Sequence, residues 1–194
     1  MSTSSEPDPE VALRAVVGRR SISKLTEPGP SHPELEAMLA VAATAPDHAR
    51  LRPWRFVVLE GEALAELGEA YARALVARDP QASDEQLERA RGKPQRSPTL
   101  VAVIARLTSH ETVRDWEQLA ATGAAAHNLC IAATAYGYGS MWRTGWYAEH
   151  PLVLAHLGVD AGERLVALIH LGTPVEGYTP RPREGTLPPV SWRG

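Results

Sequence analysis

Three short apolar runs, each long enough for one strand, set the framework of this chain. They are Trp54 to Glu60, Thr99 to Leu107 and Arg164 to Gly172. The first run, Trp-Arg-Phe-Val-Val-Leu-Glu, predicts a strand that is buried on both faces. None of the apolar runs reaches the roughly 18 residues that a membrane-spanning helix needs. The sequence therefore predicts a sheet at the core of the fold and no membrane segment.

Helical patterns surround these strands. The sequence predicts helices over 9–18, from Ser31 until Pro46 ends the helix, and over 62–78, 84–91, 113–136 and 150–157. Ser31 and Glu34 have the spacing of a capping box. The helix over 113–136 carries a stripe of small residues that suits either a dimer contact or the core of a monomer: Leu119, Gly123, Ala126, Cys130 and Ala133.

The charge balance and the cysteine count exclude several classes of protein. With 20 Lys and Arg against 23 Asp and Glu, the net charge of -3 argues against nucleic-acid binding. The single cysteine, Cys130, excludes an intrachain disulfide framework. Residues 1–8 are polar and acidic and lack the apolar core of a signal peptide. We expect a disordered leader over 1–8, one domain over 9–194, and a cytoplasmic location.

Cations gather in three loops beside the predicted elements. The loops are Arg19 to Lys24, Asp47 to Arg52 and Trp142 to Thr144, and Arg181 with Arg183 forms a possible fourth group. Arginine can bind a phosphate through two hydrogen bonds, and lysine adds a point charge. A solvated basic corner is the alternative for the first loop. Together the loops predict a site for an anionic, partly aromatic ligand, with the polar stretch 79–98 as a solvated excursion or a lid.

Several common kinds of catalytic site are absent from the sequence. His110-Glu111 has no second histidine four residues after the first, and one cysteine with scattered histidines makes no zinc spacing. Gly137-Tyr138-Gly139 lacks the third glycine of a dinucleotide fingerprint and follows a helix. No Gly-x-Ser-x-Gly elbow is present. We therefore assign no catalytic side chain and no metal ligand.

Four motifs in order resemble the FMN-dependent nitroreductase family. The first is Gly-Arg-Arg-Ser-x-Ser-Lys after the first helix, and the second is Ala-Pro-Asp-His-Ala-Arg-Leu-Arg-Pro-Trp-Arg-Phe over 45–56. The third is the small-residue helix that runs into Gly-Tyr-Gly-Ser-Met-Trp-Arg-Thr-Gly over 137–145, and the fourth is Leu-Gly-Thr-Pro over 171–174. The resemblance spans about residues 10–183. It is closest to the compact, single-domain NAD(P)H nitroreductases whose second-helix loop carries Pro-Asp-His.

The resemblance implies a fold, an assembly and a set of cofactor contacts. The fold is α+β, with a central, mostly antiparallel sheet flanked by helices, in an intertwined homodimer that binds FMN at its interface. The proline-rich tail would embrace the partner chain. The residues that the resemblance assigns to FMN binding come from three segments, the second contributed by the other chain: Arg19, Arg20 and Ser21; Thr44 and His48; Trp142, Arg143 and Thr144.

Some of these assignments have alternatives. His48 could be a loop histidine bonded to backbone, and Trp142 could be an ordinary core residue. Arg181 and Arg183 lie where some family members bind the phosphate, although a solvated tail explains them equally. Family members often place a cation two residues after the first-segment serine, whereas this chain has Ser23 there and Lys24 next. Which group lies near flavin N1 and O2 therefore stays open.

The implied activity follows from the cofactor. NAD(P)H would pass hydride to flavin N5 and leave, and a nitroaromatic, quinone or similar small-molecule acceptor would take its place, giving ping-pong kinetics. Trp116, Trp146 and Tyr147 could line the acceptor side, with core or interface packing as the alternative. One alternative function is a flavoprotein of the same fold with a specialised biosynthetic redox substrate. Another is a flavin-binding module without turnover, and a third is a fold relative that has lost FMN.

Overall fold

The computed structural model describes residues 9–180, 185 and 188–193. The predicted leader over 1–8 and the two tail arginines, Arg181 and Arg183, lie outside the described residues. Within them, no helix is both long enough and apolar enough to cross a membrane.

The described strands form one five-stranded sheet. The strands are β1 (Leu25–Thr26), β2 (Trp54–Glu60), β3 (Thr99–Arg106), β4 (Gly139–Arg143) and β5 (Glu163–Pro174). The order across the sheet is β1-β5-β3-β2, and β4 pairs with β5 beside this path. All four strand pairings are antiparallel. The three apolar runs of the sequence are thus β2, β3 and β5, and the predicted α+β sheet is confirmed.

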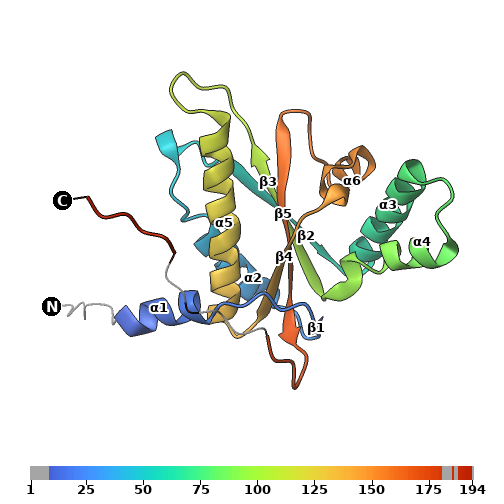
Figure 1. Cartoon of the computed structure of the whole chain (residues 1–194), viewed down its shortest axis with the longest axis horizontal. Helices are drawn as coiled ribbons and strands as arrows, with labels where there is room; N and C mark the ends of the chain where they lie inside the picture. The colour runs from blue at the N-terminus through green and yellow to red at the C-terminus, as the bar shows by residue number, and fades with distance from the viewer. Residues whose placement is uncertain (1–8, 181–184, 186–187, 194) are drawn as a thin grey trace.

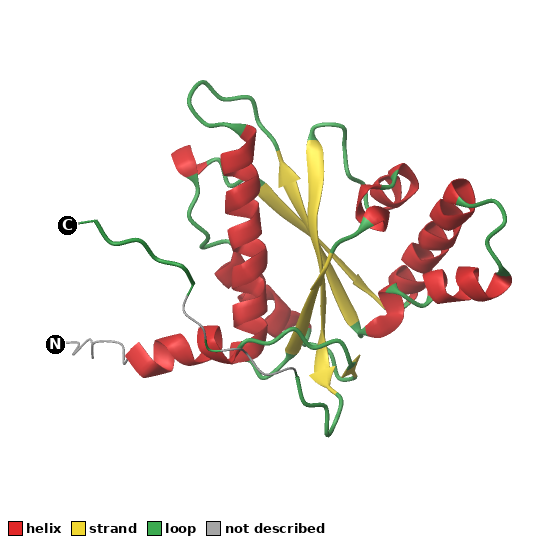
Figure 2. Cartoon of the chain, viewed as in Figure 1, coloured by secondary structure: helices red, strands yellow, loops and turns green. Residues whose placement is uncertain are grey.

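Helices cover both faces of this sheet, as Figures 1 and 2 show. On one face α5 (Asp115–Ala135) and α2 (His32–Ala42) pack together. On the other face lie α3 (Glu62–Arg78), α4 (Asp84–Arg91) and α6 (Pro151–His156). The first helix, α1 (Pro9–Gly18), contacts the C-terminal part of α5 at the edge of the molecule. Three short 3-10 helices complete the described elements: η1 (His48–Arg50), η2 (Pro94–Arg96) and η3 (Trp146–Glu149).

The core divides into two apolar layers, one on each face of the sheet. The side chains of β5 enter the two layers in turn, because successive side chains of a strand point to opposite faces of the sheet. Ala167, Ile169 and Leu171 face α2 and α5. Leu168 faces α3 and α6, and it belongs to the same apolar layer as Leu67 of α3. The strand β3 is buried along almost its whole length, which agrees with its central place in the sheet.

Two expectations about the second helix and the first strand run need correction. The strand β2 is not buried on both faces, since Val58 is 38% exposed. The strand lies at the end of the sheet, where the covering helices reach less of its surface. The helix α2 ends at Ala42, four residues before Pro46. The amides of Thr44 and Ala45 then bond three residues back, in tight turns. This fits the conformational restriction on a residue that precedes proline.

Candidate functional site

The segment after α1 runs alongside β4. Ser21 forms an isolated parallel bridge with Ser140, and the amide of Ile22 donates a hydrogen bond of 2.9 Å to the Ser140 carbonyl. Gly139 permits this close approach, since a Cβ there would lie 2.6 Å from Leu25 Cδ2. The structure therefore brings Arg19 to Ser21 together with the strand that leads into Trp142, Arg143 and Thr144.

The backbone at the end of β4 presents two available donors. Thr144 and Gly145 are exposed, and within the described part of the chain their amides donate no hydrogen bond. Gly145 has φ 115° and ψ 178°, a region that is essentially restricted to glycine. This conformation turns the chain away from the sheet directly after Thr144. Two neighbouring N–H groups are thereby left open to a ligand.

The two arginines of the first segment differ in their surroundings. The Arg20 guanidinium donates from Nη1 to the Val17 carbonyl at 2.8 Å and to the Arg19 carbonyl at 3.0 Å. It therefore caps the end of α1, where carbonyl groups lack helical partners. Arg19 is half-buried. Burial raises the pKa of the Cys130 thiol, and the positive charge of Arg19 acts in the opposite direction. Arg19 thus lies near the C-terminal half of α5.

The predicted second segment lies at the opposite end of α5. His48 Nδ1 is 3.0 Å from the Glu117 carboxylate, in the first turn of that helix. The Arg114 amide, and then His48, hold the pKa of Glu117 below its ordinary value. At 1.5 Å per residue, the helical positions of Glu117 and Cys130 are about 20 Å apart. One chain therefore does not bring His48 and Arg19 together, as Figure 1 shows for η1 and α1.

The remaining residues of the second and third segments are placed as follows. The Thr44 hydroxyl donates a hydrogen bond of 2.7 Å to the Val41 carbonyl and is exposed just beyond α2. Trp142 is half-buried and packs against the core layer that α2 and α5 cover. Arg143, the next residue of β4, lies on the other face. Burial, and then the charge of Arg96, lower the pKa of the Arg143 guanidinium.

Arg143 and Thr144 line a small cavity of about 140 Å³, termed here the inner cavity. The other lining residues are two aromatic residues, two cations, a leucine and a histidine: Tyr71, Tyr147, Lys93, Arg96, Leu168 and His170. A second cavity of about 530 Å³, termed the outer cavity, shares Lys93, Arg96 and Tyr147 with it and also contacts Trp146. Residues of the polar stretch 79–98, which the sequence predicts as an excursion or lid, form part of the wall of both cavities.

Some of the residues that line the two cavities were candidate site residues in the sequence, and others were not. Lys93 and Arg96 lie in the polar stretch but were not singled out, and His170 is hidden in the apolar run of β5. Trp146 and Tyr147 were candidates for the acceptor side, and both line the outer cavity. Trp116 does not line either cavity, because it is 68% exposed on the first turn of α5.

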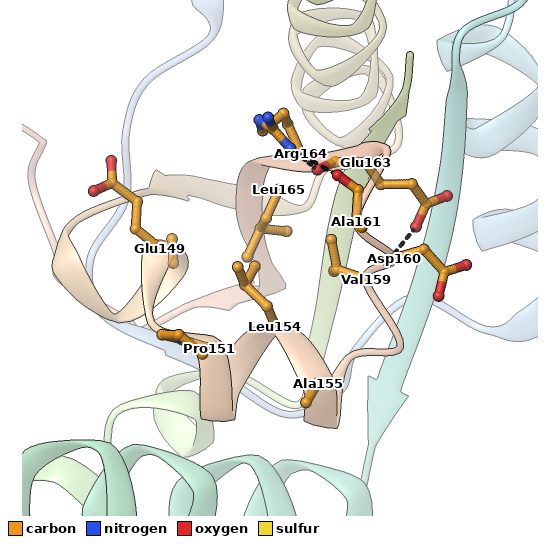
Figure 3. A pocket seen from close by; sticks show the side chains of 11 residues that line it. Glu149, Pro151, Leu154, Ala155, Val159, Asp160, Ala161, Glu163, Arg164 and Leu165 are labelled. Carbon is orange, nitrogen blue, oxygen red and sulfur yellow. Dashed lines mark hydrogen bonds between the residues drawn. The ribbon is translucent and has the colours of Figure 1, made fainter. Parts of the chain in front are cut away.

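A further cavity lies elsewhere, between η3, α6 and the start of β5 (Figure 3). Its volume is about 630 Å³, and Leu154, Val159 and Leu165 form much of its wall. Two of the charged side chains that line it, Glu163 and Arg164, already form hydrogen bonds. Glu163 binds Arg55 through two hydrogen bonds, and Arg164 Nη1 donates to the Glu163 carbonyl at 2.7 Å. The cavity contains none of the predicted site residues.

No group of three or more histidine, cysteine, aspartate or glutamate residues that could hold a metal occurs among the described residues.

Comparison with known proteins identifies the family. A sequence model of the Nitroreductase family matches residues 16–173. The chain belongs to the Nitroreductase family. Among this family's members, the chain is 34% identical over 163 residues to the Escherichia coli (strain K12) protein named "Putative NAD(P)H nitroreductase YdjA", covering 84% of this chain and 88% of that protein. A similarly named Haemophilus influenzae protein is 32% identical over 166 residues, covering 85% and 89%.

Solved nitroreductases have the same fold. The crystal structure of a nitroreductase with bound FMN from Bacteroides fragilis matches with a TM-score of 0.72 and 26% identity. The match covers 95% of this chain and the whole of that one. The resemblance to nitroreductases that the four sequence motifs indicated is therefore confirmed.

Proposed function

We propose that this chain is an FMN-dependent NAD(P)H oxidoreductase that reduces nitroaromatic, quinone or similar acceptors. The names of its relatives support the nicotinamide, and the flavin in the Bacteroides fragilis structure supports the cofactor. The observation that carries the proposal is the bridge between Ser21 and Ser140. This bridge places the cationic segment after α1 beside the open amides at the end of β4.

The residues present fit FMN in their chemistry. A flavin mononucleotide needs a cation for its phosphate and hydrogen-bond donors for its ring nitrogens and oxygens. Arg19 would bind the phosphate. The Ser21 hydroxyl is exposed and forms no hydrogen bond within the described residues, so it is available to the ribityl chain or the pyrimidine edge. The amides of Thr144 and Gly145 would donate to the ring near N5.

FMN, when bound, supplies hydride transfer between NAD(P)H and the acceptor. The chain supplies position and electrostatics. The Gly145 backbone holds two N–H groups at one place on the rim of the sheet, and Arg19 anchors the far end of the cofactor. We assign no nucleophile and no general acid to any side chain. Use of one open site by NAD(P)H and the acceptor in turn gives ping-pong kinetics.

A second copy of the chain completes this site in our proposal. His48 lies about 20 Å along α5 from the first segment, so a partner chain would contribute it together with Thr44. Apolar side chains are also exposed on α1, including Leu13 at 55% and Val17 at 61%. Burying such a surface on association is favourable. A homodimer explains both the divided site and the apolar helix.

The visible absorption spectrum of the purified protein tests the proposal, followed by addition of NAD(P)H without oxygen. We expect flavin bands that bleach on reduction and return when a nitroaromatic or quinone is added. Flavin bands that NADH and NADPH both leave unchanged would instead favour a flavin-binding module without turnover. Absence of flavin, even after incubation with FMN and gel filtration, would refute the cofactor assignment.

A further inference from the structure

Three cations from two segments of the chain face the inner cavity. Lys93 directly precedes η2, Arg96 ends it, and Arg143 ends β4. Within the part of the chain that the structure describes, none of the three forms an ion pair. Burial, and then the charge of neighbouring cations, lower the pKa of Lys93 and of Arg143. The group therefore repels itself, and an anion would relieve the repulsion.

The histidine of the cavity neither adds to this charge nor balances it. The Ser97 hydroxyl donates to the Thr99 carbonyl at 2.9 Å, so it accepts the Nδ1 proton of His170 at 2.8 Å. The other ring nitrogen, Nε2, then carries no proton, because burial and the two arginines lower the pKa of His170 to about 4. His170 is a neutral wall residue that leaves the three cations uncompensated.

A flat aromatic wall adjoins the cations. The rings of Tyr71 and Tyr147 stack with centroids 4.3 Å apart, and those of Trp146 and Tyr147 stack at 3.7 Å. The Lys93 ammonium lies 4.2 Å from the Tyr147 ring centroid. Because aromatic faces and cations meet here, the chemistry suits a planar ring that carries a negative group.

We propose that Lys93, Arg96 and Arg143 bind the carboxylate of an aromatic electron acceptor. This contact makes the protein favour anionic aromatic acceptors over neutral ones. This inference rests on the proposed flavin-dependent reductase function, since Thr144 joins the inner cavity to the expected flavin contacts. An engineered cavity of about 150 Å³ holds one benzene ring. The inner cavity, at about 140 Å³, is of that size and too small for the three fused rings of a flavin.

Two acceptors of matched ring and nitro group test the inference: 4-nitrobenzoate, which is anionic, and 4-nitrobenzyl alcohol, which is neutral. The measured quantity is the ratio of their kcat/KM values with the flavin-loaded enzyme. We expect this ratio to fall about tenfold in Lys93→Met and in Arg96→Met, because each loses a charge-assisted hydrogen bond to the carboxylate. Arg96 is exposed, so its variant should keep the fold.

The control is Arg73→Met, which removes the same charge from an exposed position on α3 outside both cavities. Its ratio should equal that of the wild type. A binding measurement needs neither turnover nor flavin: titration with benzoate, followed by tryptophan fluorescence, since Trp146 lines the outer cavity. We expect benzoate to bind about tenfold more weakly to both cavity variants and equally to the control.

The outcomes separate this inference from the proposed function. An unchanged acceptor ratio and unchanged benzoate affinity in both cavity variants would overturn the carboxylate site. Loss of FMN retention with an unchanged ratio would assign the cations to the flavin, and loss of only the preference between NADPH and NADH would assign them to the nicotinamide phosphate. Both results overturn the inference. Benzoate binding that needs Lys93, in a protein that takes up no flavin even after incubation with FMN, would refute the proposed function and support the anion site.

Discussion

His170 Nδ1 lies 2.8 Å from the Ser97 hydroxyl, and this bond holds a neutral histidine against a cationic cavity. Both residues are buried, His170 at 4% exposure. Burial, and then the charges of Arg143 and Arg96, lower the pKa of His170 from 6.5 to about 4. The imidazole is therefore neutral in the folded state wherever the pH is above that value.

Stability should depend on pH through this histidine. In the unfolded state the ring protonates near its ordinary pKa of 6.5, whereas in the folded state it does so near 4. The free energy of unfolding should therefore fall as the pH drops from about 6.5 to about 4, by about 3 kcal/mol at most. Urea unfolding of the wild type and of His170→Asn across this range measures the effect. The variant should show a shallower slope, and parallel curves would contradict the prediction.

The ion pair between Arg55 and Glu163 should stabilise the fold. Arg55 Nε donates to Glu163 at 2.7 Å and Nη2 at 2.5 Å, and Glu163 is buried. Glu163→Gln should lower the free energy of unfolding by about 2 kcal/mol at neutral pH. This loss is smaller than for a fully buried pair, because Arg55 is partly exposed to water.

Acid should reduce the effect of the Glu163 substitution. The bonds from Arg55 hold the pKa of Glu163 below its ordinary 4.5, so its contribution is present above that pH and is lost as the pH falls further. Urea unfolding at pH 7 and at low pH checks both statements. The exposed pair between Glu85 and Arg89 is the control, and Glu85→Gln should change little. Equal losses for the two glutamates would contradict the prediction.

The two arginines after α1 should differ in their effect on FMN. Arg20 already donates to two backbone carbonyls, so Arg20→Ala should mainly loosen the end of α1. Arg19→Ala should weaken FMN binding about tenfold or more, because it removes a charged phosphate contact. Titration of each apoprotein with FMN, followed by quenching of flavin fluorescence, gives the two affinities. If Arg20→Ala costs more FMN affinity than Arg19→Ala, the assignment of the phosphate to Arg19 is wrong.

The exposed face of α1 should be a dimer contact. We expect the wild type to elute at the mass of two chains, and Leu13→Asp to raise the monomer fraction at low micromolar concentration. A carboxylate would be costly in a buried apolar interface. Val76→Asp places the same charge at an apolar residue of α3 that is 45% exposed and should leave the mass unchanged. Light scattering coupled to gel filtration measures both. A wild type that is monomeric would remove the basis for a divided site.

The local elements of the fold were predictable because each depends on near neighbours in the sequence. The predicted bounds of α1, α3 and α4 agree with the structure. The capping box of Ser31 and Glu34 is present, with the Glu34 carboxylate accepting from the Ser31 amide at 2.9 Å. The strand β1 was missed, since two residues show no periodicity. It exists only because β5 extends far enough to pair with it.

The sequence by itself determined most of the helices and the three long strands, the family resemblance and the cationic loops, since these are properties of short segments. Only the tertiary structure decided that Ser21 lies beside Ser140, that His48 lies far from Arg19, and that Lys93 shares a cavity with Arg143. Those relationships arise from pairing and packing between distant segments. No local sequence pattern predicts them. Bringing distant segments together costs loop-closure entropy, and only the contacts of the assembled sheet offset that cost.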